Sequence, residues 1–208
     1  MTTESNPKKS HWEHIYETKP LETVSWYQSF PDTSLSLIAD LQLAKDSRIL
    51  DVGGGDSLLS EHLLSEGYGH ISVLDISGAA LQRAQKRLGD KANSINWIES
   101  DVLDFKSVHP LELWHDRAAF HFLTTDSDVK SYVQIAKEAI RPGGFMILGT
   151  FAVNGPTKCS GLPIRQYDSN LLMEAFGAYF ELLHYQETDH KTPGGSIQKF
   201  YFATLKRR

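Results

Sequence analysis

The segment Arg48–Ser57 limits the possible folds of this chain more than any other, and it reads Arg-Ile-Leu-Asp-Val-Gly-Gly-Gly-Asp-Ser. Apolar residues before the glycines predict a buried β-strand, and the glycines predict a tight turn into a helix. Glycine has no Cβ, so such a turn adopts positive φ readily and lets a ligand approach the backbone. Open α/β sheets bind ligands at the carboxyl ends of their strands, which makes Asp51 a candidate binding residue.

The spacing of these glycines separates two classes of ligand. In the dinucleotide fingerprint G-x-G-x-x-G, Gly53 and Gly55 fit the first two positions, but Leu58 takes the third, which needs a small residue. Asp56 brings negative charge to the start of the helix, where a diphosphate would bind. The pattern therefore favours a ligand without phosphate and disfavours an NAD-dependent oxidoreductase.

The composition excludes several other classes of function. A net charge of −5 argues against nucleic acid as a partner, since phosphate binding needs a basic face. The single cysteine, Cys159, rules out an internal disulfide, and no CxxC pair suggests a metal site. We expect residues 1–10 to be disordered, and their polar sequence does not resemble a signal peptide. No apolar run reaches the roughly 20 residues that span a bilayer, so we expect a cytoplasmic protein that does not contact membranes.

Predicted strands and helices alternate along most of the chain. Strands are expected at 49–52, 71–74, 95–98 and 145–151, and residues 111–114 start a further strand that has Asp116 and Arg117 at its end. Helices are expected between the strands at 58–64, 77–88 and 126–140. Ser77 is expected to cap the second of these helices, and Asp126 or Ser127 the third. The alternation implies a mostly parallel sheet with right-handed crossovers. Strands at 179–185 and 197–205 have no helix between them and should form an antiparallel hairpin, giving a Rossmann-like, doubly wound sheet of seven strands.

Residues 1–45 are expected to form an aromatic-rich helical segment in front of a ligand-binding domain at 46–208. Trp12 and Tyr16 are four residues apart and share a helix face, and Trp26 follows closely. These rings form either a lid over the site, where aromatic faces attract cations, or packing that joins the N-terminal helices to the sheet.

Three aspartates stand at or just after the ends of the first three predicted strands: Asp51, Asp75 and Asp101. In a doubly wound sheet these ends lie side by side. The grouped carboxylates suit a ligand with hydroxyls, amines or positive charge. Asp75 is positioned for the two hydroxyls of a ribose, and Asp101 with Val102 for the edge of an adenine. Each acid alone is equally typical of a helix cap or a loop start.

The chain resembles the class I S-adenosylmethionine-dependent methyltransferases, of the type 11/12-like kind, over about residues 45–207. The residues that carry the resemblance are 50–57, 73–77, 99–102 and 141–148. The resemblance implies S-adenosyl-L-methionine as cofactor, with its methionine part over Gly53 and Gly55. It also implies the contacts of the remaining groups: Asp51 with the amino group, Asp75 with the ribose, Ile76 with the adenine face, and Asp101 and Val102 with the adenine edge.

In that family the methyl acceptor lies near the segment after the fourth strand, here residues 114–122. The candidate catalytic residues are Asp116, Arg117 and His121, and His115 is a further possible base. Alternatively, Asp116 and Arg117 pair with each other and fix the loop. The candidate substrate-binding residues are Trp12, Tyr16, Trp26 and Phe120. Cys159 and residues 160–165 should border the acceptor pocket, because they follow the fifth strand.

The sequence therefore predicts an S-adenosylmethionine-dependent methyltransferase with a small-molecule acceptor. A partial resemblance to thiopurine methyltransferases, carried by residues 116–118, 132, 143–144 and 160–163, favours a thiol or another soft nucleophile. A soft anion needs no base, whereas an amine or hydroxyl must lose a proton. Two alternatives stay open: a protein (lysine) methyltransferase, because such enzymes also carry N-terminal Trp and Tyr residues, and a catalytically silent cofactor-binding module.

Overall fold

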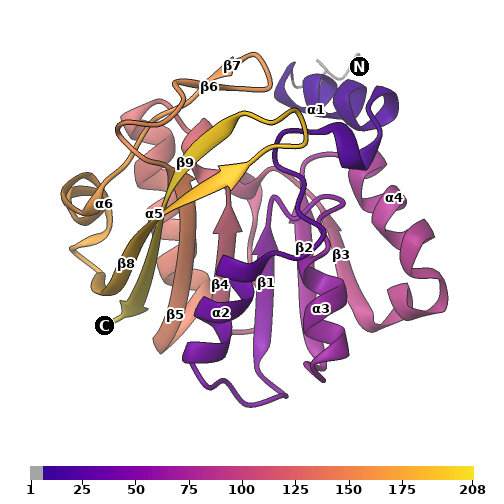
Figure 1. Ribbon diagram of the computed structural model, residues 1–208. Helices are drawn as coiled ribbons and strands as arrows, with labels where there is room; N and C mark the ends of the chain where they lie inside the picture. Colours follow the sequence, from indigo (N-terminus) through magenta and orange to yellow (C-terminus); the bar gives the residue numbers. More distant parts are fainter. Residues whose placement is uncertain (1–6) are drawn as a thin grey trace, which may run out of the picture.

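A seven-stranded sheet organises residues 7–208, the part of the chain that this computed structural model describes. The strand order is β3-β2-β1-β4-β5-β9-β8 (Figure 1). The strands are β1 (Arg48–Val52), β2 (His70–Asp75), β3 (Ile95–Glu99), β4 (Leu111–Arg117), β5 (Ile140–Phe151), β8 (Phe180–Lys191) and β9 (Ile197–Arg207). The pairs among β1 to β5 are parallel, and β9 runs antiparallel to both β5 and β8. The predicted doubly wound sheet with its antiparallel hairpin is confirmed.

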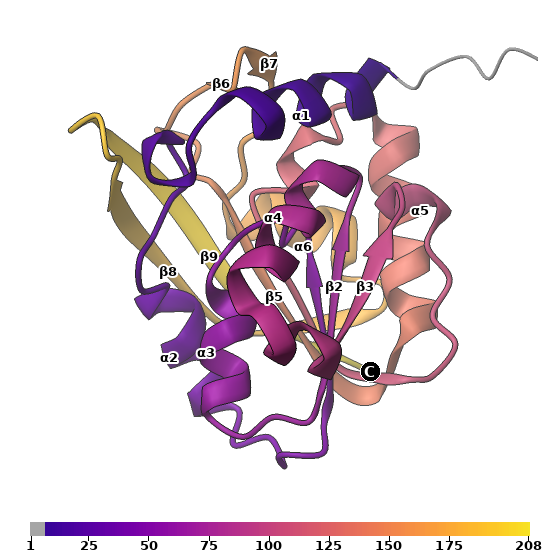
Figure 2. The same ribbon diagram turned by 90° about the vertical axis from the view of Figure 1, so that its right-hand side faces the viewer.

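Helices cover both faces of the sheet (Figures 1 and 2). One face carries α2 (Asp32–Asp40), α3 (Leu59–Ser65) and α4 (Gly78–Leu88), whose apolar side chains pack with Ile49, Ile71 and Leu113. The opposite face carries α5 (Asp126–Ala139) and α6 (Ser169–Phe176), which pack with Leu50 and Trp114. Successive strand residues point to opposite faces, so each central strand supplies both cores.

Side-chain caps mark where α4 and α5 begin. Ser77 accepts from the backbone N–H of Ala80 and caps α4, as predicted. The cap of α5 is Thr125, which accepts from the N–H of Asp128, so the prediction of Asp126 or Ser127 is wrong by one or two residues. Both hydroxyls and carboxylates serve as caps, and three such residues in a row leave the choice to the backbone geometry.

The C-terminal hairpin is longer than the sequence suggested. β8 reaches Lys191, and only a short turn containing Gly195 precedes β9. The polar stretch at 186–191 resembled a loop, but β8 is the edge strand of the sheet, and an antiparallel edge strand can expose polar side chains to water. The chain between β5 and α6 also forms a small hairpin, β6 (Lys158–Cys159) with β7 (Leu162–Pro163).

The N-terminal segment covers one edge of the sheet and also contributes to the sheet core. α1 (Pro7–Thr18) lies across the carboxyl ends of the parallel strands (Figures 1 and 2), whereas Leu37 and Ile38 of α2 are part of the sheet core. The expected disorder at 1–10 is thus wrong from Pro7 onward, and residues 1–6 lie outside the described part. Three short 3₁₀ turns bear on the site: η1 (Leu21–Thr23), η3 (Val102–Asp104) and η4 (Phe120–Phe122). Within residues 7–208, none of the helices has both the length and the apolar character needed to cross a membrane.

Candidate active site

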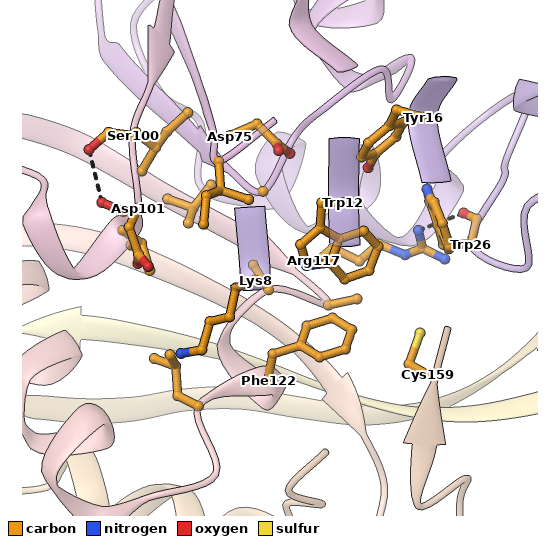
Figure 3. Close-up of a pocket in the computed structure, with 18 residues that line it drawn as sticks. Lys8, Trp12, Tyr16, Trp26, Asp75, Ser100, Asp101, Arg117, Phe122 and Cys159 are labelled. Carbon is orange, nitrogen blue, oxygen red and sulfur yellow. Dashed lines mark hydrogen bonds between the residues drawn. The ribbon is translucent and has the colours of Figure 1, made fainter. Parts of the chain in front are cut away.

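A cavity lies at the carboxyl edge of the sheet, beneath α1 (Figure 3). Asp75 and Asp101 line one end, and Trp26, Arg117 and Cys159 line the other. A second, inner cavity shares Gly53, Trp26 and Arg117 with the first and is lined in addition by Asp51, Gly54, Ser34 and His115. The sheet therefore brings the three predicted aspartates to one region, but Asp51 faces a different compartment from the other two.

The glycine turn forms the floor between these compartments. Gly53 and Gly55 have φ values of 63° and 47°, which glycine adopts without strain. A Cβ on Gly55 would lie 2.7 Å from Tyr16 Oη and 3.0 Å from Asp75 Oδ2. A Cβ on Gly53 would lie only 2.5 Å from the Cβ of Ala119. The turn therefore packs so closely against Ala119, Tyr16 and Asp75 that neither glycine position has room for a side chain.

The carboxylate of Asp75 is buried, which disfavours its charged form. It ends β2, is 6% exposed, and its Oδ1 accepts from the backbone N–H of Ser77 at 2.8 Å. Burial raises the pKa of Asp75 to about 7, and the nearby carboxylates of Asp56 and Asp51 act in the same direction, against the effect of the Ser77 hydrogen bond. A ligand that donates hydrogen bonds to this carboxylate would relieve the cost of burying it.

Asp51 belongs to a buried chain of three side chains. His115 Nδ1 lies 2.7 Å from Asp51 Oδ1, and His115 Nε2 lies 2.9 Å from Ser34 Oγ. With the Nδ1–H donating to the carboxylate, Nε2 accepts from the serine hydroxyl. Both ring nitrogens are therefore occupied, so His115 serves to hold Asp51 rather than to act as a base.

Asp101 combines the two roles that the sequence left open. It caps η3 by accepting from the backbone N–H of Leu103 at 3.0 Å, and it also lines the cavity together with Val102. Ile76 lines the same end of the cavity, next to Asp75. The predicted nucleoside-binding residues are thus adjacent in space.

Aromatic side chains cover the cavity from above. Trp12 of α1 lies edge-on to Trp26 and Phe122, with ring centroids 5.8 Å and 5.1 Å apart, and Tyr16 lies 6.1 Å from Trp26. These rings pack against one another and also line the cavity (Figure 3). The same side chains therefore both cover the site and pack the N-terminal segment onto the sheet.

A carboxylate ties this cover to the sheet layer. Glu13 of α1 accepts from Ser77 Oγ at 2.9 Å and from the backbone N–H groups of Gly78 and Ala79 at 2.8 and 3.0 Å. These donors are at the start of α4, where the helix dipole favours negative charge. Arg83 of α4 in turn donates to the carbonyls of Tyr16 and Lys19, near the end of α1.

Replacing Glu13 by alanine is expected to loosen the cover. Hydrogen bonds to a charged group contribute about 1.5–3 kcal/mol, so opening of α1 should become roughly tenfold or more favourable. Amide hydrogen exchange of residues 7–18 would measure this change, with Glu17→Ala, an exposed carboxylate on the same helix, as the control. Equal exchange rates in the two variants would show that Glu13 does not hold α1.

The pairing of Asp116 with Arg117 is not present. Adjacent strand residues face opposite sides of the sheet, so Asp116 points toward Tyr132 of α5, and Arg117 toward Trp26 and Phe200 of β9. Asp116 is fully buried and accepts from Tyr132 Oη at 2.6 Å and from the N–H groups of Ala119 and Phe120. Burial raises the pKa of Asp116 to about 6. It holds the loop after β4 and does not line the cavity.

His121 and Phe120 also lie away from the cavity. Both are fully buried in η4, and Phe120 packs among Tyr132, Tyr167 and Phe176. Burial, and to a smaller extent Arg117, lower the pKa of His121 to about 3, so its ring is neutral. Phe122 lines the cavity instead, a residue that the sequence analysis did not select.

Comparisons with known proteins agree with this geometry. Residues 49–144 match the family model of a methyltransferase domain. The ubiquinone biosynthesis O-methyltransferase of Pectobacterium carotovorum subsp. carotovorum is 27% identical over 107 residues, 51% of this chain and 44% of that protein. The eEF1A lysine and N-terminal methyltransferase of Bos taurus is 21% identical over 141 residues, 67% of this chain and 20% of that protein. The chain thus spans less than half the length of these two relatives.

Solved structures share the whole fold. A SAM-dependent methyltransferase from Anabaena variabilis superposes with a TM-score of 0.72 at 16% identity, over 98% of this chain and 96% of its own. The N-methyltransferase NodS from Bradyrhizobium japonicum, in complex with S-adenosyl-L-homocysteine, gives 0.70 at 14% identity, over 94% and 97% of the two chains. Residues 49–144 thus match a methyltransferase domain, and the chain as a whole shares the fold of these S-adenosylmethionine-dependent methyltransferases.

Proposed function

We propose that this chain binds S-adenosylmethionine in the described cavity and transfers its methyl group to a small-molecule acceptor. The observation that carries the proposal is the buried Asp75 carboxylate, which lines the cavity at the end of β2. This carboxylate would accept from the ribose hydroxyls. Ile76, Asp101 and Val102 would then surround the adenine, because they line the same end of the cavity.

The inner cavity fits the amino-acid part of the cofactor. Asp51 lines this compartment, and a Cβ on Gly54 would lie 2.6 Å from Asp51 Oδ2. His115 occupies the other carboxylate oxygen, so Oδ2 is the one that would accept from an ammonium group. Structures of similar fold support this use of the cavity, because several are described with S-adenosyl-L-homocysteine or sinefungin bound.

The protein contributes positioning and exclusion of water. The bound cofactor supplies a methyl group that is already activated on a sulfonium. Trp12, Trp26 and Phe122 enclose the cavity, and their faces favour a cation over water. Holding two reactants in line inside such an enclosure is worth about 7–11 kcal/mol of the barrier.

A small acceptor agrees better with the site than a protein side chain. α1 covers the cavity, and the guanidinium of Arg117 lies at the end away from the nucleoside residues (Figure 3). A lysine ammonium placed beside Arg117 would meet a like charge. The similarity to the eEF1A methyltransferase keeps protein lysine as the second candidate, and the same experiment examines both.

Calorimetry and labelling test the proposal together. The purified chain should bind S-adenosylmethionine and S-adenosylhomocysteine, and not NAD. With cofactor labelled on its methyl group and a cell lysate depleted of other methyltransferases, we expect label in the small-molecule fraction. Label in protein bands would favour the second candidate, and absence of cofactor binding would overturn the assignment.

A further inference from the structure

Arg117 is a half-buried cation, and one of its donor nitrogens has no hydrogen-bond partner. Its Nη1 donates to the carbonyl of Trp26 at 2.9 Å, and its guanidinium lies 5.0 Å from the centroid of the Phe200 ring. Its Nη2 is buried and has no hydrogen-bond partner. A buried charged donor left unpaired costs more than a neutral one, so an anion placed beside Arg117 would be stabilising.

The surroundings of Arg117 offer no counter-charge. Among residues 7–208 it forms no ion pair with a carboxylate, and Asp51, whose charge acts on it, is bound to His115. Burial, followed by the charge of Arg117, lowers the pKa of both His121 and His190, so these rings are neutral. Burial lowers the pKa of Arg117 itself to about 10, which leaves it charged at neutral pH.

The same end of the cavity offers no base. The titratable groups that line it beside Arg117 are Tyr16 and Cys159, and burial raises the pKa of both. Both groups are therefore protonated at neutral pH. Trp12, Trp26 and Phe122 complete a largely apolar wall (Figure 3). An acceptor that must lose a proton would find no group here to take it.

We propose that the methyl acceptor is a small organic anion whose charge lies on the reacting atom, a thiolate in particular, and that Arg117 binds it. This inference rests on the proposed methyltransferase function. The thiolate lone pair forms the new bond to the methyl carbon, and the electron pair of the broken bond stays on the cofactor sulfur. A thiolate and a sulfonium thus become two neutral thioethers, with no proton transferred. The neutral product is no longer attracted by Arg117, which favours its release.

The cofactor carboxylate is the other anion that could meet Arg117, because Arg117 lines the inner cavity as well. The Arg117→Met variant distinguishes whether Arg117 binds the acceptor anion or the cofactor carboxylate. We expect its Kd for S-adenosylmethionine to stay within about threefold of the wild type, while kcat/KM for benzenethiol falls at least tenfold. Arg117→Lys should recover part of that loss. Arg141→Met removes an exposed arginine from the opposite end of the sheet and should change neither quantity.

A binding experiment on the unaltered protein makes the test independent of variant folding. In the complex with S-adenosylhomocysteine, benzoate should bind at least tenfold more tightly than benzamide, its neutral counterpart. Benzenethiol should be methylated at least a hundredfold more efficiently than aniline.

Three results would overturn the inference while leaving methyltransferase function intact: equal binding of benzoate and benzamide, equal methylation of aniline and benzenethiol, or a tenfold loss of cofactor affinity in Arg117→Met with acceptor preference unchanged. Failure of the wild-type chain to bind S-adenosylmethionine would instead overturn the proposed function itself.

Discussion

Replacing Asp75 by asparagine is expected to weaken S-adenosylmethionine binding by roughly 10- to 100-fold. Hydrogen bonds to a charged group contribute about 1.5–3 kcal/mol, and the amide both lowers the acceptor strength and presents a donor to the ribose hydroxyls. Titration calorimetry of the two proteins above pH 7, where the wild-type carboxylate is ionised, would measure the change. Asp90→Asn, which changes an exposed acid just after the C-terminal end of α4, is the matched control.

The same substitution should make the cofactor-free protein more stable. The pKa of Asp75 is raised from 3.8 to about 7, so the folded state binds the extra proton between these values and loses stability as pH rises through them. The penalty is complete above pH 7 and amounts to at most about 4 kcal/mol, since each unit is worth ~1.36 kcal/mol. Asparagine has no such penalty. The Tm of the variant should therefore exceed that of the wild type by a margin that grows from pH 4 to pH 7, and two parallel Tm curves would contradict this account.

Replacing His115 by alanine is expected to have the opposite effect on stability. The substitution leaves the buried Asp51 carboxylate without its 2.7 Å partner. Removing one member of a buried pair costs about 3–5 kcal/mol, which for a chain of this size lowers Tm by roughly 6–20 °C. Cofactor affinity should fall as well, because Asp51 would no longer be held at the inner cavity.

Two further variants isolate the cause. Ser34→Ala removes only the outer, neutral hydrogen bond of the chain and should cost about 1 kcal/mol. The double variant His115→Ala with Asp51→Asn should regain much of the lost stability, since the buried group is then uncharged, but not the cofactor affinity. If the double variant is no more stable than His115→Ala, the loss comes from the cavity left by the imidazole rather than from the carboxylate.

The fold and the nucleoside end of the site follow from local patterns. Alternating strands and helices fix a parallel sheet, and an aspartate after such a strand can only lie at its carboxyl edge. Asp75 and Asp101 could therefore be placed from the sequence alone. The glycines carried the same kind of information, because positive φ is a property of the residue itself.

The positions of the residues after the fourth strand could not be predicted from local sequence patterns. Asp116 and Arg117 were expected at the end of the fourth strand and are its last two residues, so their side chains point to opposite faces of the sheet. The alternative in which these two residues pair with each other is therefore wrong. The tight turn of η4 likewise buries Phe120 and His121 and leaves Phe122 at the cavity. The contact of His115 with Ser34 joins residues far apart in sequence and could not be foreseen.

The junction between Ser77 and Glu13 has a consequence for the order of events on the molecule. The backbone N–H of Ser77 binds Asp75, while its hydroxyl and the next two N–H groups bind Glu13 of α1. Asp75, proposed to bind the ribose, and Glu13, which holds α1, are thus both bound by the backbone around Ser77. If Asp75 has that role, we expect uptake of the nucleoside, closure of α1 and release of the product to be coupled.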